Sequence, residues 1–196
     1  CEFYLVEDRH KQHFTKELKD RRFHQLLLAK NEIGYKNLVK LSSLSFTEGF
    51  YSKWARIDKE LLLQYHEGII ATSCCIGAII PQLIKYDEYE KAEEELKWWL
   101  EIFGEDYYLE LQRHELPAQK KINHFLLQMS EKYNVKTIAT NDAHYIEKED
   151  AGSHDILLCI NTGELRSTPK KDDLDDESDQ RGRRFGFNNN EYYFKT

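Results

Sequence analysis

Strand-like and helix-like segments alternate along most of the 196-residue chain. Short runs of β-branched and apolar residues predict strands at 2–7, 23–29, 68–75, 106–114, 136–140 and 191–195. Apolar residues at helical spacing predict helices at 31–49, 59–66, 77–85, 89–103, 117–134 and 148–161. Because strands that alternate with helices form largely parallel sheets, this order predicts an α/β fold, either a sheet or a barrel.

The stretch at 137–145 reads TIATNDAHY, a short buried strand that runs into polar residues. Residues two apart on an extended backbone point to the same side, so Asp142 and His144 would present a carboxylate and an imidazole together. The C-terminal ends of strands are where α/β folds place their chemistry. The pair suits zinc, manganese or iron, and the alternative is a strand end with an Asx-type turn and a half-exposed histidine.

Three other predicted strands also carry residues that bind metals in proteins. These residues are Glu2 on the first strand, Ser73, Cys74 and Cys75 at the end of 68–75, and Glu110 and His114 on 106–114. In a parallel barrel such strand ends converge on one rim. Each residue has a structural alternative, for example Cys75 as a small buried hydrophobe. Together they form a mixed nitrogen, oxygen and sulfur set, and two or three such metal ions suit hydrolysis of a phosphate ester.

Other histidines and aromatic residues are interpreted as ordinary. His10 and His13 have H-x-x-H spacing, but the densely charged segment 8–22 around them predicts a solvated loop. His24 is interpreted as a half-exposed side chain on its strand. The segment 50–58, which contains Arg56, predicts a loop whose aromatic residues pack locally.

Composition narrows the classes of protein. The net charge of −7 argues against a strongly basic face, so if the chain acts on nucleic acid, other parts of a longer protein would hold the substrate. The four cysteines include no C-x-x-C pair, which leaves a zinc ribbon unsupported and favours a reducing, cytosolic setting. No apolar run is long enough to span a bilayer and no signal peptide is evident, so no membrane partner is expected.

Both ends of the chain suggest a larger protein. The first residue is Cys1, inside a predicted strand, so we expect a piece of a longer chain. The segment 168–184 mixes both charges and lacks the regular ligand spacing of a calcium loop, which predicts a flexible solvated loop. The closing strand at 191–195 would then lead into a next domain.

Seven stretches together resemble one known family, in the same order and over nearly the whole chain. They are CEFYL at 1–5, LLAKNEIGYKNLVKLSS at 27–43, EGFYSKWARID at 48–58, GIIATSCCIG at 68–77, YYLELQRHE at 107–115, TIATNDAHY at 137–145 and HDILLCINTG at 154–163. The sequence resembles the PHP (polymerase and histidinol phosphatase) domain at the N-terminus of bacterial DNA polymerase III alpha subunits. Seven ordered matches are far more specific than any single motif.

The resemblance implies a distorted seven-stranded (βα) barrel with a dinuclear or trinuclear metal centre. The family's metal ligands fall on Glu2, Cys75, His114, Asp142 and His144 of this chain, with Glu110 and Arg56 as second-rank candidates. Zinc or manganese is the expected metal, and magnesium is a further alternative. Residues 1–163 would form a partial PHP domain, and 164–196 a charged flexible loop and closing strand that lead toward a polymerase core.

Two departures from the family pattern qualify this expectation. The family's H-x-H motif and further ligands would precede Cys1, so we expect an incomplete barrel, partial metal occupancy and little activity of the chain by itself. Glu115 also stands where many relatives have glycine after the histidine.

Three functions compete. In the first, the chain belongs to a cytoplasmic replicative polymerase whose PHP domain is a metal-dependent 3′–5′ exonuclease, with DNA and other polymerase III holoenzyme subunits as partners. In the second, the domain is an inert scaffold that stabilises the polymerase and binds a proofreading subunit. The third is a stand-alone PHP phosphatase, which GFYSKWARID and NEYYFK disfavour because they are more similar to the polymerase branch. The upstream H-x-H motif and a downstream polymerase palm would discriminate among them.

Overall fold

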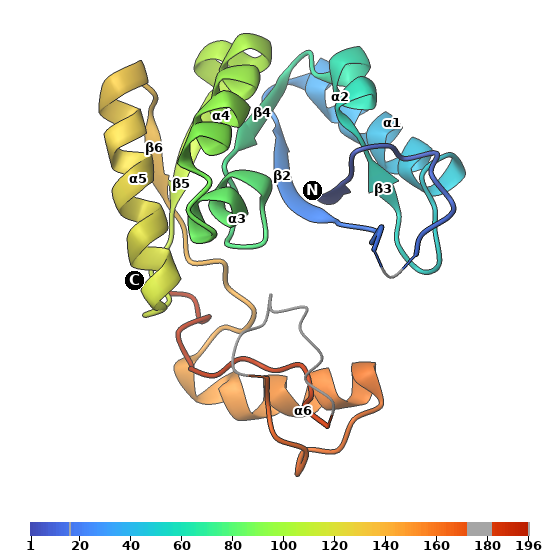
Figure 1. The fold of residues 1–196 in the computed structure, drawn as a ribbon, viewed down its shortest axis with the longest axis vertical. Coiled ribbons are helices and arrows are strands. Elements are labelled where there is room, and N and C mark those ends of the chain that lie inside the picture. Colours follow the sequence, from blue (N-terminus) through green and yellow to red (C-terminus); the bar gives the residue numbers. More distant parts are fainter. Residues whose placement is uncertain (16, 172–181, 196) are drawn as a thin grey trace. The chain divides into compact units, whose positions relative to one another are not determined.

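The computed structural model describes residues 1–15, 17–171 and 182–195 and has two compact units (Figure 1). Unit 1 comprises Cys1–Leu111 and Lys121–Ile138, and unit 2 comprises Gln112–Lys120 and Ala139–Thr196. The loop predicted at 168–184 falls largely outside the described residues. The domain ranges 1–163 and 164–196 stay predictions.

The described residues contain a six-stranded sheet. Its strands are β1 (Glu2–Leu5), β2 (Phe23–Ala29), β3 (Arg56–Ile57), β4 (Ile69–Thr72), β5 (Tyr107–Leu111) and β6 (Thr137–Ala139), in the spatial order β3-β1-β2-β4-β5-β6. The β1–β3 and β4–β5 pairs are parallel, whereas β2 runs antiparallel to both β1 and β4. The predicted α/β class is therefore confirmed with a mixed sheet, and closure into a barrel stays a prediction.

Helices follow the strands from β2 onward, in the order that the sequence predicts. They are α1 (Glu32–Thr47), α2 (Lys59–Tyr65), α3 (Ile79–Lys85), α4 (Tyr89–Phe103), α5 (Pro117–Tyr133) and α6 (Ala151–Thr162), with short 3₁₀ turns at Gly104–Asp106 and Lys148–Asp150. None of the helices in the described residues is both long and apolar enough to cross a membrane.

The core of unit 1 lies between its sheet and its helices. Trp99 of α4 is fully buried, and its ring stacks on Phe103 at 5.5 Å and on Tyr107 of β5 at 5.6 Å between centroids. Such aromatic pairs stabilise a core beyond the area they bury. The periodicity of 89–103 predicted this helix with the bounds that the structure has.

Two predictions of local structure are wrong. Residues 50–58 are not all loop, because Arg56 and Ile57 form β3 beside β1; two residues are too few for a recognisable strand pattern. Residues 191–195 do not form a strand, and Tyr193 makes only an isolated bridge with Tyr145. Their apolar pattern instead reflects buried side chains such as Tyr192, which is 3% exposed.

Two buried arginines anchor the segment predicted to be a solvated loop at 8–22. The Arg56 guanidinium, fully buried, donates to the carbonyl oxygens of Gly49, Arg9 and Lys11 and to the Asp20 carboxylate at 2.8–3.0 Å. Arg9 is itself buried and donates to Asp58 at 2.8 Å. The prediction of a solvated loop is therefore wrong for part of this segment. It treated every charged side chain as exposed, whereas Arg9 is buried.

The start of α1 is fixed by a close approach of two glycines. Asn31 caps the helix by accepting the Gly34 N–H at 3.0 Å, as the sequence predicts. The turn before β4 passes directly beside this cap, and Gly68 there has φ +71°, which glycine adopts without strain. A Cβ on Gly34 would lie 1.7 Å from the Gly68 carbonyl oxygen, so only glycine fits.

We expect Gly34→Ala to destabilise the protein by about 1–3 kcal/mol, the usual cost of overpacking. Alanine is normally better than glycine inside a helix by about 1 kcal/mol. Gly152→Ala in α6 is the matched control, because nothing lies within 4 Å of the added Cβ there. Urea denaturation would measure both changes, and a gain in stability from both substitutions would contradict the close approach.

Candidate metal centre

The pairing of β1 with β2 brings Glu2 and His24 to one face of the sheet. Glu2 lies opposite Leu26 and Tyr4 lies opposite His24. Glu2 and His24 are therefore diagonal neighbours, a separation that long side chains can bridge. The Glu2 Oε1 atom lies 2.8 Å from His24 Nδ1.

The antiparallel pairing of β2 with β4 brings Cys75 to the same place. Leu27 pairs with Ala71, so the end of β4 at Thr72 lies near the beginning of β2. The chain then turns, and Cys75 Sγ lies 3.4 Å from His24 Nδ1. Three strands thus bring a carboxylate, an imidazole and a thiol together.

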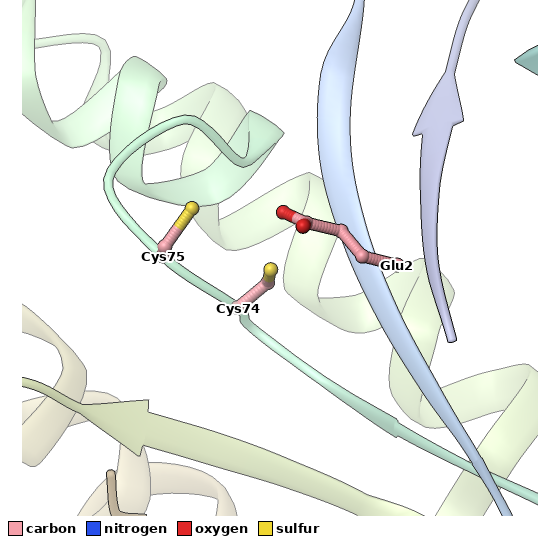
Figure 2. Close-up of side chains that lie close together, drawn as sticks. All are labelled: Glu2, Cys74 and Cys75. Atoms are coloured by element: carbon pink, nitrogen blue, oxygen red, sulfur yellow. The ribbon is translucent and has the colours of Figure 1, made fainter. Parts of the chain in front are cut away.

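Cys74 belongs to the same group. The ligand atoms of Glu2, Cys74 and Cys75 all lie within 4.8 Å of one another, and Figure 2 shows the three side chains pointing toward a common space. Both cysteines are buried, whereas the Glu2 side chain is 56% exposed. Across 1–15, 17–171 and 182–195, this is the one set of three or more His, Cys, Asp or Glu ligand atoms close enough to hold a metal ion.

The site favours positive charge on His24. Its hydrogen bond with Cys75 is the largest cause and its hydrogen bond with Glu2 the next, and together they raise the pKa of His24 to about 10 against the opposing effect of burial. Glu2 and Cys75 thus favour a cation at the position between them. A metal ion bound by His24 would have to displace this proton, because a ligating imidazole is neutral.

The turn that carries the cysteines is held by buried polar contacts. Thr72 donates its hydroxyl to the Glu110 carboxylate at 2.7 Å and accepts the Cys74 N–H at 3.0 Å. Glu110 of β5 also donates its backbone N–H to the Ser73 hydroxyl at 2.8 Å. Glu110, a second-rank ligand candidate in the sequence, therefore supports the residues that carry the cysteines.

Gly77 leaves room for the His24 ring. Its carbonyl oxygen accepts the His24 backbone N–H at 3.0 Å. A Cβ at this position would lie 3.3 Å from the ring atoms Cγ and Nδ1, so a side chain would displace the imidazole.

Three of the predicted ligands lie in unit 2. His114 is 1% exposed, its Nε2 hydrogen-bonds the Asn141 carbonyl oxygen at 2.9 Å, and burial lowers its pKa. Asp142 has φ +46°, so the backbone is not extended there and the rule that predicted Asp142 and His144 on one side does not apply. The Nδ1 atom of His144 hydrogen-bonds the Asp142 backbone carbonyl oxygen at 2.7 Å.

An aromatic cluster surrounds these histidines within unit 2. Tyr192 stacks on His114 with ring centroids 4.2 Å apart, and Tyr192 and Phe187 both meet the edge of His144. His154 of α6 lies 5.7 Å from His144 between ring centroids, and burial, followed by the His144 charge, lowers the pKa of His154. The roles of His114, Asp142 and His144 as ligands stay predictions.

A buried ion pair fixes the segment that carries Phe187. Arg184, 3% exposed in its side chain, donates to both oxygens of Asp155 at 2.8 and 2.9 Å. Lys170 Nζ lies 3.1 Å from the same carboxylate. Hydrogen bonding from Arg184 is the largest cause that lowers the pKa of Asp155 to about 2.

The residues of unit 1 fit a metal ion by their chemistry. Thiolate, imidazole and carboxylate groups are the usual zinc ligands, with metal–ligand bonds of about 2.0–2.3 Å. The side chains at this site would need to move only slightly to reach such distances from one ion. The guanidinium of Arg56, a second-rank candidate in the sequence, donates to backbone carbonyls and to Asp20, and a role at the site stays a prediction.

Comparison with known proteins shows the family of the chain. The PHP domain family matches residues 1–114. The chain belongs to the PHP domain family. DNA polymerase III subunit alpha of Borreliella burgdorferi and that of Thermus aquaticus are each 45% identical over 174 residues, 89% of this chain. The same subunit of Treponema pallidum is 36% identical over 197 residues, 100% of this chain.

The matched relatives are much longer than this PHP chain. The alignments cover 14%, 13% and 16% of the Borreliella, Thermus and Treponema proteins. The chain therefore spans a small part of their length. The resemblance to the PHP domain of DNA polymerase III alpha subunits is confirmed.

Sequence reasoning missed His24 and undervalued Cys74 in this PHP domain. His24 is half-exposed, as the sequence predicts, with 38% of its side chain exposed. The sequence did not predict that its ring contacts both Glu2 and Cys75. The two-residue offset across an antiparallel pair would have revealed it, but the sequence predicted a parallel arrangement. His10 and His13, whose H-x-x-H spacing is typical of metal motifs, are both exposed.

We expect the Asp155–Arg184 pair to make the stability of the PHP chain sensitive to acid. The carboxyl pKa falls from 3.8 to about 2 on folding, so the pair contributes fully above about pH 4 and its contribution is lost as pH falls toward 2. Asp155→Asn should cost about 3 kcal/mol at neutral pH, because it leaves Arg184 buried beside a neutral group.

Chemical denaturation of the wild type and Asp155→Asn from pH 6 downward would measure this difference. The difference should shrink below about pH 4. Asp106→Asn, which removes a partly exposed ion pair with Lys30, is the control and should cost less than about 1 kcal/mol. A difference between wild type and Asp155→Asn that stays constant down to pH 2 would be inconsistent with a depressed carboxyl pKa.

Proposed function

We propose that this chain is the PHP part of a DNA polymerase III alpha subunit and contributes to a metal-dependent 3′–5′ exonuclease site. The observation that carries the proposal is the convergence of Glu2, His24 and Cys75 from three strand segments. A decayed site would have no reason to retain a carboxylate, an imidazole and a thiol in mutual contact. The identity to polymerase subunits supports the choice of DNA as substrate.

The residues have distinct roles in this proposal. Glu2, His24 and Cys75 would hold a zinc or manganese ion, with magnesium as the alternative if oxygen ligands dominate. A divalent ion there would supply Lewis-acid chemistry for hydrolysis of the terminal phosphodiester. Thr72 and Glu110 hold the cysteine-bearing turn in place. His114, Asp142 and His144 are proposed as further ligands on the strength of the family resemblance.

Other properties of the parent protein follow from the same proposal. Its partners would be DNA and the other subunits of the polymerase III holoenzyme, and its location would be the cytoplasm. The distorted (βα) barrel is also proposed, from the resemblance to the family. The net charge of −7 of this chain implies that other parts of the polymerase bind most of the DNA phosphates.

The test is an exonuclease assay of the full-length polymerase on a DNA primer with a mismatched 3′ end. Glu2→Gln and Cys75→Ser should each lower metal-dependent 3′–5′ cleavage by at least about tenfold, the smallest loss usual for changes around a metal site. The rate of primer extension should stay within about twofold of wild type, because nucleotidyl transfer needs a separate site.

Glu7→Gln is the matched control, since it makes the same exchange on an exposed residue just beyond β1. Unchanged cleavage by Glu2→Gln and Cys75→Ser would refute the exonuclease assignment. A wild-type polymerase without cleavage, whose Glu2 and Cys75 variants lose binding to a proofreading subunit, would instead establish the scaffold function.

A further inference from the structure

Cys74 has a backbone conformation that cysteine normally avoids. Its φ is +58°, in the left-handed region that favours glycine. Such a conformation costs a β-carbon-bearing residue on the order of 1 kcal/mol or more and persists only where its surroundings enforce it. Here the Cys74 N–H donates to the buried Thr72 hydroxyl at 3.0 Å, which helps to fix the turn.

The consequence of this conformation is the direction of the thiol. The Cys74 side chain points toward Glu2 and Cys75 (Figure 2), and its ligand atom lies within 4.8 Å of theirs. The residue is 7% exposed and forms no disulfide. Two adjacent thiols therefore face one carboxylate, with the His24 imidazole beside them.

We propose that Cys74 is a second thiolate ligand of this centre and makes it selective for zinc over manganese and magnesium. The proposal rests on the metal site of the proposed function and adds a residue and a metal preference to it. Soft thiolates favour zinc, whereas manganese and magnesium prefer carboxylate, carbonyl and water oxygens. A single thiolate among oxygen and nitrogen ligands still permits manganese or magnesium to bind, whereas a second thiolate favours zinc.

The distances allow this coordination. Ligand sulfurs around a tetrahedral zinc lie about 3.8 Å apart when each Zn–S bond is about 2.3 Å. The ligand atoms of Glu2, Cys74 and Cys75 now lie within 4.8 Å of one another, so the two sulfur atoms would have to approach each other by about 1 Å or less to bind one zinc ion. His24 Nδ1, which lies 2.8 Å from Glu2 Oε1 and 3.4 Å from Cys75 Sγ, is the candidate for a fourth donor, and four is the number that zinc takes in closed sites.

The competing explanation is that Cys74 is a small core residue. It packs with Cys75, Ala78 and the partly buried Leu26 in a minor apolar cluster. In that case glycine or serine at position 74 would leave metal binding unchanged. Packing alone gives no reason for a strained cysteine where glycine would fit without strain.

The test uses cobalt(II) and zinc(II) binding to the full-length protein, prepared free of metal under reducing conditions. Cobalt bound to thiolates has a charge-transfer band in the near ultraviolet, and its intensity grows with the number of thiolates. We expect the double variant Cys74→Gly/Cys75→Ser to lose the thiolate band. Each single variant should lose about half as much intensity as the double variant. Cys74→Gly should also weaken zinc binding at least about tenfold with little change for manganese.

Two controls separate coordination from folding. Glycine suits the positive φ of residue 74, so thermal unfolding of metal-free Cys74→Gly should occur no earlier than that of wild type. Cys74→Ser retains a side chain of similar size and should lose the same part of the cobalt band. Cys159→Ala, at a buried cysteine of α6, should leave the cobalt band intact.

The outcomes distinguish this proposal from the exonuclease function. If Cys74→Gly and Cys74→Ser retain the full band and zinc affinity while Cys75→Ser loses them, the role of Cys74 is overturned and the metal site stands. If wild type shows no band attributable to Cys74 or Cys75, the two-thiolate site is overturned together with the metal site. A two-thiolate band in a polymerase without 3′–5′ cleavage supports Cys74 and refutes only the exonuclease function.

Discussion

The antiparallel pairing of β2 with both of its neighbours is the constraint on which the candidate centre depends. In this arrangement Glu2 at the start of β1 and His24 near the start of β2 become diagonal neighbours, and the end of β4 reaches the same place. A shift of one residue in either register would turn Glu2 or His24 to the opposite face of the sheet. The chemistry of the site is therefore specified by backbone hydrogen bonds at least as much as by the ligands.

Hydrogen bonds between buried polar groups then fix the position of the turn that carries Cys74 and Cys75. The Thr72 hydroxyl links Glu110 of β5 to the backbone of Cys74, so the cysteine-bearing turn is tied to the next strand of the sheet. A buried carboxylate is costly unless it accepts hydrogen bonds, which explains why Glu110 is not free to move away. The same logic applies to Arg56, whose buried guanidinium gathers backbone carbonyls from a charged segment.

Different interactions stabilise the conformation of unit 2. Its described residues include the helix α6, and the rings of Tyr192 and Phe187 surround its histidines. The Asp155–Arg184 pair holds the chain near Phe187. Aromatic stacking and the Asp155–Arg184 ion pair thus order this part of unit 2, whereas strand pairing organises unit 1.

The sequence by itself determined the α/β class, the helix 89–103, the strand 23–29, the cap at Asn31 and the family. These follow from periodicity, local hydrogen bonding and ordered motifs, which are properties of neighbouring residues. The family resemblance also predicted Glu2 and Cys75 as metal ligands, and these roles stay predictions. Only the tertiary structure decided that His24 joins them, that Cys74 faces them and that Asp142 leaves the extended conformation. These features depend on strand direction, register and a left-handed turn, which arise from pairing between segments far apart in the chain and leave no periodic signal within any one of them.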